Sequence, residues 1–192
     1  MQMLVEFIKT RIPGCYEVNF AAQEDPRGMF VKVFDHSIFC QKRLEARFME
    51  TFYTVSGSNV LRGMHLQLPP ADHAKLVYCV TGKVMDVVLD VRKGSPTYGA
   101  HAMIELDASL YNGVYLSRGL AHGFSVLRAP AVMVYHVTSA HAAHLDVGVA
   151  WDSFGARWPI ESPLISPRDA TLPPLDEFNS PFKYSPDVEV DG

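Results

Sequence analysis

Hydrophobic residues along this chain are gathered into short runs rich in Val, Tyr, Phe and Leu, and turn-forming residues separate the runs. Short strands at a spacing of about ten residues, punctuated by Gly and Pro, are typical of an antiparallel sandwich or barrel. The expected strands lie within FVKVF (30–34), FMETFYTV (48–55), KLVYCV (75–80), KVMDVVLDV (83–91), AHAMIEL (100–106), GVYL (113–116), AVMVYHV (131–137) and VGVAW (147–151). The expected turns are EDPRG (24–28), SGSN (56–59), LPPAD (68–72), VTGK (80–83), KGSPTYG (93–99), YNG (111–113), SRG (117–119) and RAP (128–130). This pattern predicts an all-β fold.

The run KVMDVVLDV (83–91) indicates how the predicted barrel uses its two faces. Alternate residues of a strand point to opposite faces, so Asp86 and Asp90 share one face with two valines. The other face is wholly apolar and suits a core. The mixed face suits either a polar barrel lumen or a solvated surface of an antiparallel sheet, and this strand alone favours neither.

Two segments depart from the strand pattern. HSIFCQKRLEARF (36–48) reads as one short helix, and the chain from about residue 159 is proline-rich. We expect the proline-rich part to wrap the barrel as loop and short helix, with the last ten or so residues loose. The chain is then a single domain over 1–192, with an N-terminal arm at about 1–35, a β-barrel core at about 45–155 and a wrapping segment at about 156–192.

Composition narrows the class of protein. The 192 residues are 48% apolar and 20% charged with a net charge of −4, which gives material for a core and makes disorder unlikely over most of the chain. No clustered basic stripe is present, so nucleic-acid binding is disfavoured, while a small anionic ligand held by a few arginines stays open.

The cysteines and the N-terminal segment indicate a compartment. Cys15, Cys40 and Cys79 are odd in number and widely spaced, which argues against a disulfide framework and fits a reducing environment. The segment MQMLVEFIKTRIPG mixes charges into its apolar run, so it reads as neither a signal peptide nor a membrane span. We therefore expect a cytoplasmic protein that does not contact a membrane.

Candidate chemistry begins in RGMHLQLPPADHAKLV (62–77), which places Arg62, His65 and Lys75 on two short apolar segments. His122 follows a glycine turn in SRGLAHGF, several strands later. Glycine-flanked histidines at matching strand ends resemble the two motifs of a cupin-type double-stranded β-helix, or jelly roll. In metal-binding cupins the first motif is His-x-His with a nearby Glu, whereas Gln67 and no such glutamate stand here. The missing ligands disfavour a tightly bound metal ion, which needs three or four.

Lys75 has two interpretations. A lysine that points into a β-lumen is costly unless it meets an anion, and it could then stabilise an enolate oxygen. Alternatively, its amine could reach solvent from the end of the strand. The neighbouring Arg62 and His65 favour the first interpretation.

Several longer stretches extend this resemblance over about residues 10–180. They are DPRGMFVKVF (25–34), SNVLRGMHLQ (58–67), KLVYCVTGKVMDVVLDVRKGSPTYG (75–99), GLAHGFSVL (119–127), VYHVTSAH (134–141), VAWDS (149–153), WPIESPLISPRDA (158–170) and LPPLDEF (172–178). In this order they resemble the dTDP-4-dehydrorhamnose 3,5-epimerase family, the metal-free cupins of deoxysugar nucleotide biosynthesis.

The resemblance implies a set of roles. His65 of the RGxH motif would be the base that removes a proton next to the C4 ketone of a nucleotide-linked sugar, oriented by Asp169. Lys75 would face the keto oxygen, and Tyr135 would return a proton from the opposite face of the sugar. The resemblance further implies substrate and diphosphate contacts by Arg62 and His122, an arm arginine (Arg27) that reaches a neighbouring subunit, a homodimer, and no cofactor.

This chain departs from the family pattern on the presumed nucleotide side of the site. Glu50 and Phe52 replace the usual Gln and Asn, His141 stands where the family often has a tyrosine, and Asp146 replaces a glutamate. We expect Glu50, Phe52 and His141 to contact the substrate there.

These departures leave several functions open. One is a different nucleotide, such as CDP or GDP, and another is inversion of C3 or C5 rather than both. A ketoisomerase is disfavoured because Lys75 and Asp169 are both retained. A non-catalytic sugar-nucleotide-binding cupin is disfavoured by the intact acid–base set, and a metal-dependent oxygenase by Gln67.

Overall fold

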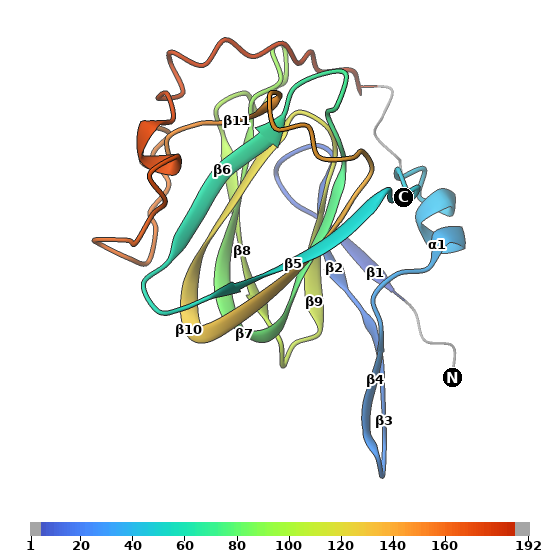
Figure 1. Ribbon diagram of the computed structural model, residues 1–192. Helices are drawn as coiled ribbons and strands as arrows, with labels where there is room; N and C mark the ends of the chain where they lie inside the picture. The colour runs from blue at the N-terminus through green and yellow to red at the C-terminus, as the bar shows by residue number, and fades with distance from the viewer. Residues whose placement is uncertain (1–4, 187–192) are drawn as a thin grey trace.

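The computed structural model describes residues 5–186, which form a β-barrel with a small helix at its side (Figure 1). The all-β jelly-roll prediction is confirmed. The strands are Glu6–Lys9 (β1), Cys15–Asn19 (β2), Ala21–Asp25 (β3), Gly28–Lys32 (β4), Glu50–Ser56 (β5), Leu61–Gln67 (β6), Lys75–Asp90 (β7), His101–Asp107 (β8), Asn112–Leu116 (β9), Leu120–Val137 (β10) and Asp146–Gly148 (β11); the helices are His36–Gln41 (α1) and the 3₁₀ turn Asp169–Thr171 (η1).

The two longest strands of the barrel, β7 and β10, pair with each other in antiparallel orientation over most of their length. The first part of β10 pairs with β6 and its last part pairs with β5. The first part of β7 pairs with β9 and its last part pairs with β8. Each long strand therefore runs through two walls of the barrel, and the two strands hold the walls together (Figure 1).

The turns predicted at 80–83 and 128–130 are wrong. The chain bends there inside β7 and β10, and the β7–β10 pairing continues across the bend with register shifts. Gly82 adopts a φ of 82°, and a Cβ at this position would lie 2.4 Å from the carbonyl oxygens of Arg128 and Pro130. Glycine inside a strand is typical of such a tight barrel corner, and it does not end the strand.

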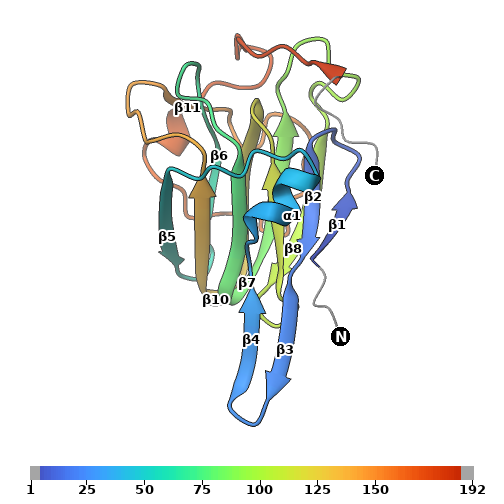
Figure 2. The ribbon, with the colours of Figure 1, turned by 90° about the vertical axis from the view of Figure 1, so that its right-hand side faces the viewer.

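The N-terminal part contributes more sheet than the sequence pattern indicated. Strands β1 and β2, which were not among the expected strands, continue the main sheet beside β9. After them, β3 and β4 form a separate hairpin that projects from the barrel (Figures 1 and 2). Its tip is the predicted turn at 24–28, where Asp25 pairs with Gly28.

The helix predicted over 36–48 is too long, because α1 ends at Gln41. Arg43 adopts a φ of 52°, in the left-handed region that breaks a helix. Beyond it, Leu44, Ala46 and Phe48 alternate with exposed residues and pack into the cluster around Phe39. The second half of the predicted helix therefore has the period of an extended segment.

Both faces of the predicted strand at 83–91 are buried. Asp86 and Asp90 are each fully buried, so the solvated-face interpretation is wrong. Asp90 pairs with Arg92, whereas Asp86 faces the polar part of the lumen described below. Buried carboxylates need such partners, because the cost of removing their charge from water is large.

The C-terminal segment crosses the outside of the barrel and closes over one apolar cluster (Figure 1). Phe178 and Phe182 pack there, and Lys93 bonds to the backbone of both Phe182 and Tyr184. The loose end that we expected is therefore docked as far as Tyr184, and residues 187–192 lie outside the described part. Within 5–186, no helix has the length and apolar character needed to cross a membrane.

Candidate active site

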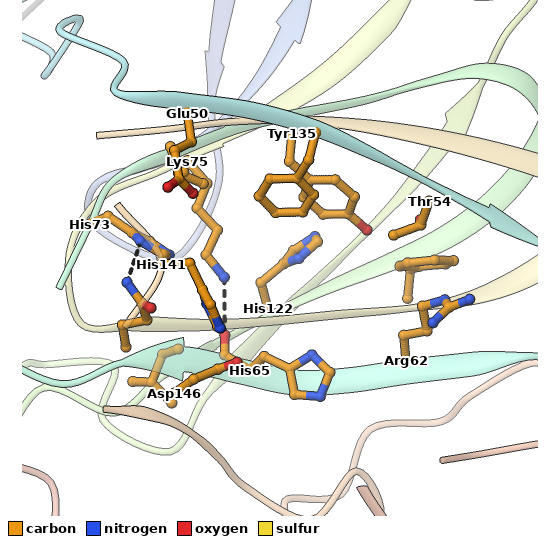
Figure 3. Close-up of a pocket in the computed structure, with 15 residues that line it drawn as sticks. Glu50, Thr54, Arg62, His65, His73, Lys75, His122, Tyr135, His141 and Asp146 are labelled. Atoms are coloured by element: carbon orange, nitrogen blue, oxygen red, sulfur yellow. Dashed lines mark hydrogen bonds between the residues drawn. The ribbon is translucent and has the colours of Figure 1, made fainter. Parts of the chain in front are cut away.

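A cavity of about 270 Å³ opens in the barrel lumen between β5, β6, β7 and β10 (Figure 3). Most of the predicted site residues line it. The lining residues are Glu50, Phe52, Thr54, Arg62, His65, Leu66, Gln67, His73, Lys75, His122, Phe124, Tyr135, Val137, His141 and Asp146.

His65 on β6 is paired with a carboxylate from the far end of the chain. Its Nε2 donates to Oδ1 of Asp169 in η1 at 2.7 Å. Burial opposes ionisation of Asp169, but the hydrogen bond and charge of His65 and the Gly63 amide outweigh burial and hold the Asp169 pKa below its usual value. An ionised carboxylate only accepts, so the neutral imidazole keeps its proton on Nε2 and leaves Nδ1 as the basic atom.

Gly63 allows this arrangement, because β6 approaches β10 very closely beside His65. Gly63 adopts a φ of 132°, and a Cβ there would lie 2.5 Å from the Cα of Gly123. The Gly63 amide also donates to Oδ2 of Asp169 at 3.3 Å. The glycine of the RGxH motif therefore both permits the close approach and helps to hold the carboxylate.

Lys75 at the start of β7 points into the cavity, and its side chain is buried (Figure 3). The alternative that its amine reaches solvent is wrong. Nζ donates to the carbonyl oxygen of His65 at 3.2 Å. Burial lowers the pKa of Lys75 to about 8, so the amine is mostly charged at pH 7.

His122 lies opposite His65 in the β6–β10 pairing and has a carboxylate of its own. Its Nε2 donates to Oδ2 of the fully buried Asp86 at 2.7 Å. Among the described residues, Oδ1 of Asp86 has no hydrogen-bond partner. The site therefore contains two histidine–aspartate pairs, of which the sequence reasoning identified one. The available signal for the second was the mixed face of the strand at 83–91.

Tyr135 on β10 faces the cavity across from His65 (Figure 3). Its ring stacks on Phe52, with ring centroids 4.9 Å apart and an interplanar angle of 11°. The His122 ring meets it edge-on at 5.9 Å. Burial raises the pKa of the phenol above its ordinary value, so Tyr135 stays protonated at neutral pH.

Arg62 lines the other end of the cavity from Glu50 (Figure 3). Its Nε donates to the Ser56 hydroxyl at 3.0 Å. It also borders, with His65 and Asp169, a second hollow of about 320 Å³ on the other side of β6. Arg62 is thus a half-buried cation at the junction of two hollows, where an anionic group can reach it.

The remaining predicted residues are more dispersed. Glu50 is half-buried on β5, and His141 is exposed in the loop after β10. Arg27 does not line the cavity: it lies at the tip of the β3–β4 hairpin, where it pairs with Asp25.

Gln67 and His73 line the cavity but were not among the predicted site residues. The Gln67 side chain bonds to the backbone of Ala71, Ala140 and Ala142, and so ties down the loop that carries His141. Burial, and then the charge of Lys75, lowers the pKa of His73 to about 3, so its imidazole is neutral. Gln67 stands where a metal-binding cupin has the second histidine of its first motif, and here its side chain holds a loop in place.

Asp146 forms an ion pair with another side chain of the same protein. Both of its oxygens accept from Arg168, at 2.9 and 2.8 Å. In residues 5–186, no group of three or more His, Cys, Asp or Glu side chains is arranged to hold a metal ion.

A jelly-roll barrel whose lumen carries acid–base side chains places the protein among the cupin-type folds with an active-site-like cavity. The chain belongs to the dTDP-4-dehydrorhamnose 3,5-epimerase family, whose model matches residues 9–177.

Individual relatives agree with this assignment. The dTDP-4-dehydrorhamnose 3,5-epimerase of Shigella flexneri is 35% identical over 165 residues, which are 84% of this chain and 91% of the relative. A Legionella pneumophila 3,5-epimerase, solved in complex with dTDP-4-keto-L-rhamnose, superposes with a TM-score of 0.90 at 28% identity and covers 95% of this chain and 100% of its own. A 3′-monoepimerase from Streptomyces bikiniensis, solved with dTDP-quinovose, gives a TM-score of 0.81 at 34% identity over 87% and 86% of the two chains.

Proposed function

We propose that this protein is an epimerase of nucleotide-linked 4-keto-6-deoxy sugars that inverts C3, C5 or both. The observation that carries the proposal is the common cavity of His65, Lys75 and Tyr135, with His65 bonded to Asp169. A hydrogen next to a ketone is weakly acidic, so its removal needs a base and a group that stabilises the enolate at the same time.

In this mechanism His65 removes the proton through Nδ1 while Asp169 supports the imidazolium. The Lys75 ammonium faces the C4 oxygen, where negative charge develops in the transition state. Tyr135 then donates its phenolic proton to the carbon from the opposite side. The tyrosinate recovers a proton from solvent, and the His65 imidazolium releases one to solvent. The positions of His65 and Tyr135 on opposite sides of the cavity support this division (Figure 3).

The substrate's diphosphate would lie beside Arg62, with His122 as a further contact. Glu50, Phe52 and His141 would be further substrate contacts, with Glu50 at the end of the cavity away from Arg62. All three differ from the family pattern: Glu50 adds a carboxylate, Phe52 adds an apolar ring, and His141 stands where a tyrosine is frequent. They support a second candidate, a mono-epimerase that acts on a CDP- or GDP-linked sugar.

We also propose a homodimer, in which Arg27 of one protomer reaches the cavity of its partner. The β3–β4 hairpin projects away from its own barrel (Figure 2), and Arg27 is 90% exposed at its tip. Met29 and Phe30 are exposed on the same hairpin, where a second copy would bury them.

Proton–deuterium exchange tests the function directly. Wild-type protein incubated in D₂O with dTDP-4-keto-6-deoxyglucose should place deuterium at C3, C5 or both, as read by NMR. His65→Asn should lower exchange by about 100-fold or more, because it removes the base and retains the shape. Full exchange by this variant would refute the role of His65. If the wild type is inactive, CDP- and GDP-linked 4-keto sugars are tested next, and inactivity with all of them would favour a binding protein.

A further inference from the structure

Phe52 has a place in the structure that core packing does not explain. It is 46% exposed, yet its ring lies almost flat on the buried ring of Tyr135. The two residues are directly opposite in the β5–β10 pairing. Directly opposed side chains in an antiparallel pair are close neighbours, so the strand register itself brings the rings together.

The Tyr135 ring is thereby confined from two directions. Phe52 covers one face, and the His122 ring meets it edge-on with an interplanar angle of 77°. His122 is itself fixed by the buried carboxylate of Asp86. A tyrosine places its hydroxyl through two side-chain torsions, and close ring contacts of this kind restrict both of them.

We propose that Phe52 is a positioning residue for Tyr135, whose ring stack fixes the direction from which the phenol returns its proton to the sugar. The inference rests on the proposed function, in which Tyr135 is the acid. Inversion requires delivery to the face opposite His65. A displaced phenol leaves the enolate to recover a deuteron from solvent-exchanged His65 on the original face, which gives isotope exchange without inversion.

The test compares two rates in one experiment. NMR in D₂O measures deuterium incorporation and the appearance of inverted sugar, and their ratio is the readout. Phe52→Leu, which keeps an apolar side chain but removes the stack, should raise the ratio of exchange to inversion by about tenfold, since small misplacements of a reacting group are costly. Phe52→Tyr keeps a ring and should restore the ratio. Tyr53→Leu is the matched control, because Tyr53 is 69% exposed on the same strand and does not line the cavity; its ratio should equal that of the wild type.

Tyr135→Phe separates the failure of this inference from failure of the proposed function. It should keep exchange and lose inversion. If it does, but Phe52→Leu lowers both rates in parallel or leaves their ratio unchanged, then the positioning role is refuted and the proposed function stands. If Tyr135→Phe inverts at the wild-type rate, or if the wild type neither exchanges nor inverts any of the three nucleotide-linked 4-keto sugars, the proposed mechanism fails and the role of Phe52 fails with it.

Discussion

The ammonium group of Lys75 is buried at the start of β7, and its effect on stability depends on pH. Burial lowers its pKa from 10.5 to about 8. Below pH 8 the amine is charged in both the folded and the unfolded chain, so the folded state carries the full cost of burying the charge. Between about pH 8 and 10.5 the folded chain loses this proton first, and the cost disappears.

Lys75→Met should therefore stabilise the protein and inactivate it. The expected gain in the free energy of unfolding is about 3 kcal/mol at pH 7, since one pKa unit corresponds to 1.36 kcal/mol. The gain should shrink between pH 8 and pH 10.5. Urea unfolding of both proteins across this pH range measures the difference. A gain that does not change with pH would show that the buried charge is not its source.

At the residue scale, sequence reasoning identified His65, which lines the cavity, but missed part of its surroundings. His65 and Asp169 are 104 positions apart, and no periodicity connects them; their pairing was expected from the family resemblance alone. Asp86 was recognised as a polar residue on a strand face, but its partner His122 is 36 positions away. Hydrogen bonds between distant segments depend on the fold, so local patterns do not reveal them.

At the scale of single elements, the corner at Gly82 is the critical point of β7. A side chain there would clash with two carbonyl oxygens of β10 and would also have to adopt a φ of 82°. Gly82→Ala should lower the free energy of unfolding by about 2–3 kcal/mol.

Gly94 offers a matched control, because its φ is also 82° but a Cβ there would meet nothing within 4 Å. Gly94→Ala carries the backbone strain without the clash and should cost about 1 kcal/mol. Denaturant unfolding of both variants measures the two contributions. Equal losses would mean that β10 moves aside at no cost, contrary to the close approach described above.

The elements that sequence analysis misjudged share one cause. Gly82 and Pro130 correctly marked changes of chain direction, but a glycine or proline does not reveal whether hydrogen bonding continues beyond it. Similarly, the apolar residues at 38–48 fit the period of a helix, but the helix ends before Arg43, which adopts a left-handed φ of 52°. Tertiary packing decides such cases, since the partner strands and the core lie far away in the sequence.

At the scale of the whole molecule, the projecting β3–β4 hairpin is the feature that a barrel alone does not need. Phe30→Asp should convert the proposed dimer into a monomer, because a charge would replace a 58% exposed ring in the expected interface. The monomer should also have a higher KM, since Arg27 would no longer reach a partner's cavity.

Light scattering after size-exclusion chromatography measures the mass of each variant. Leu110→Asp is the matched control for added charge, because Leu110 is also 58% exposed but lies between β8 and β9, outside the hairpin. A Phe30→Asp protein that keeps the wild-type mass and KM would refute both the interface and the role of Arg27.

The overall fold was predictable because strand spacing is a local property, whereas assembly depends on surfaces that no single segment defines.

Asp169 lies after all of the barrel strands in the sequence, and this position has a consequence for the order of events during synthesis. The ribosome releases His65, Lys75 and Tyr135 well before Asp169, and the barrel strands precede it as well. A nascent chain can thus pair its strands while the imidazole still lacks its carboxylate. In the proposed mechanism, turnover then requires that the segment carrying Asp169 has docked beside His65. On refolding, activity should accordingly appear no earlier than the far-ultraviolet signal of the sheet.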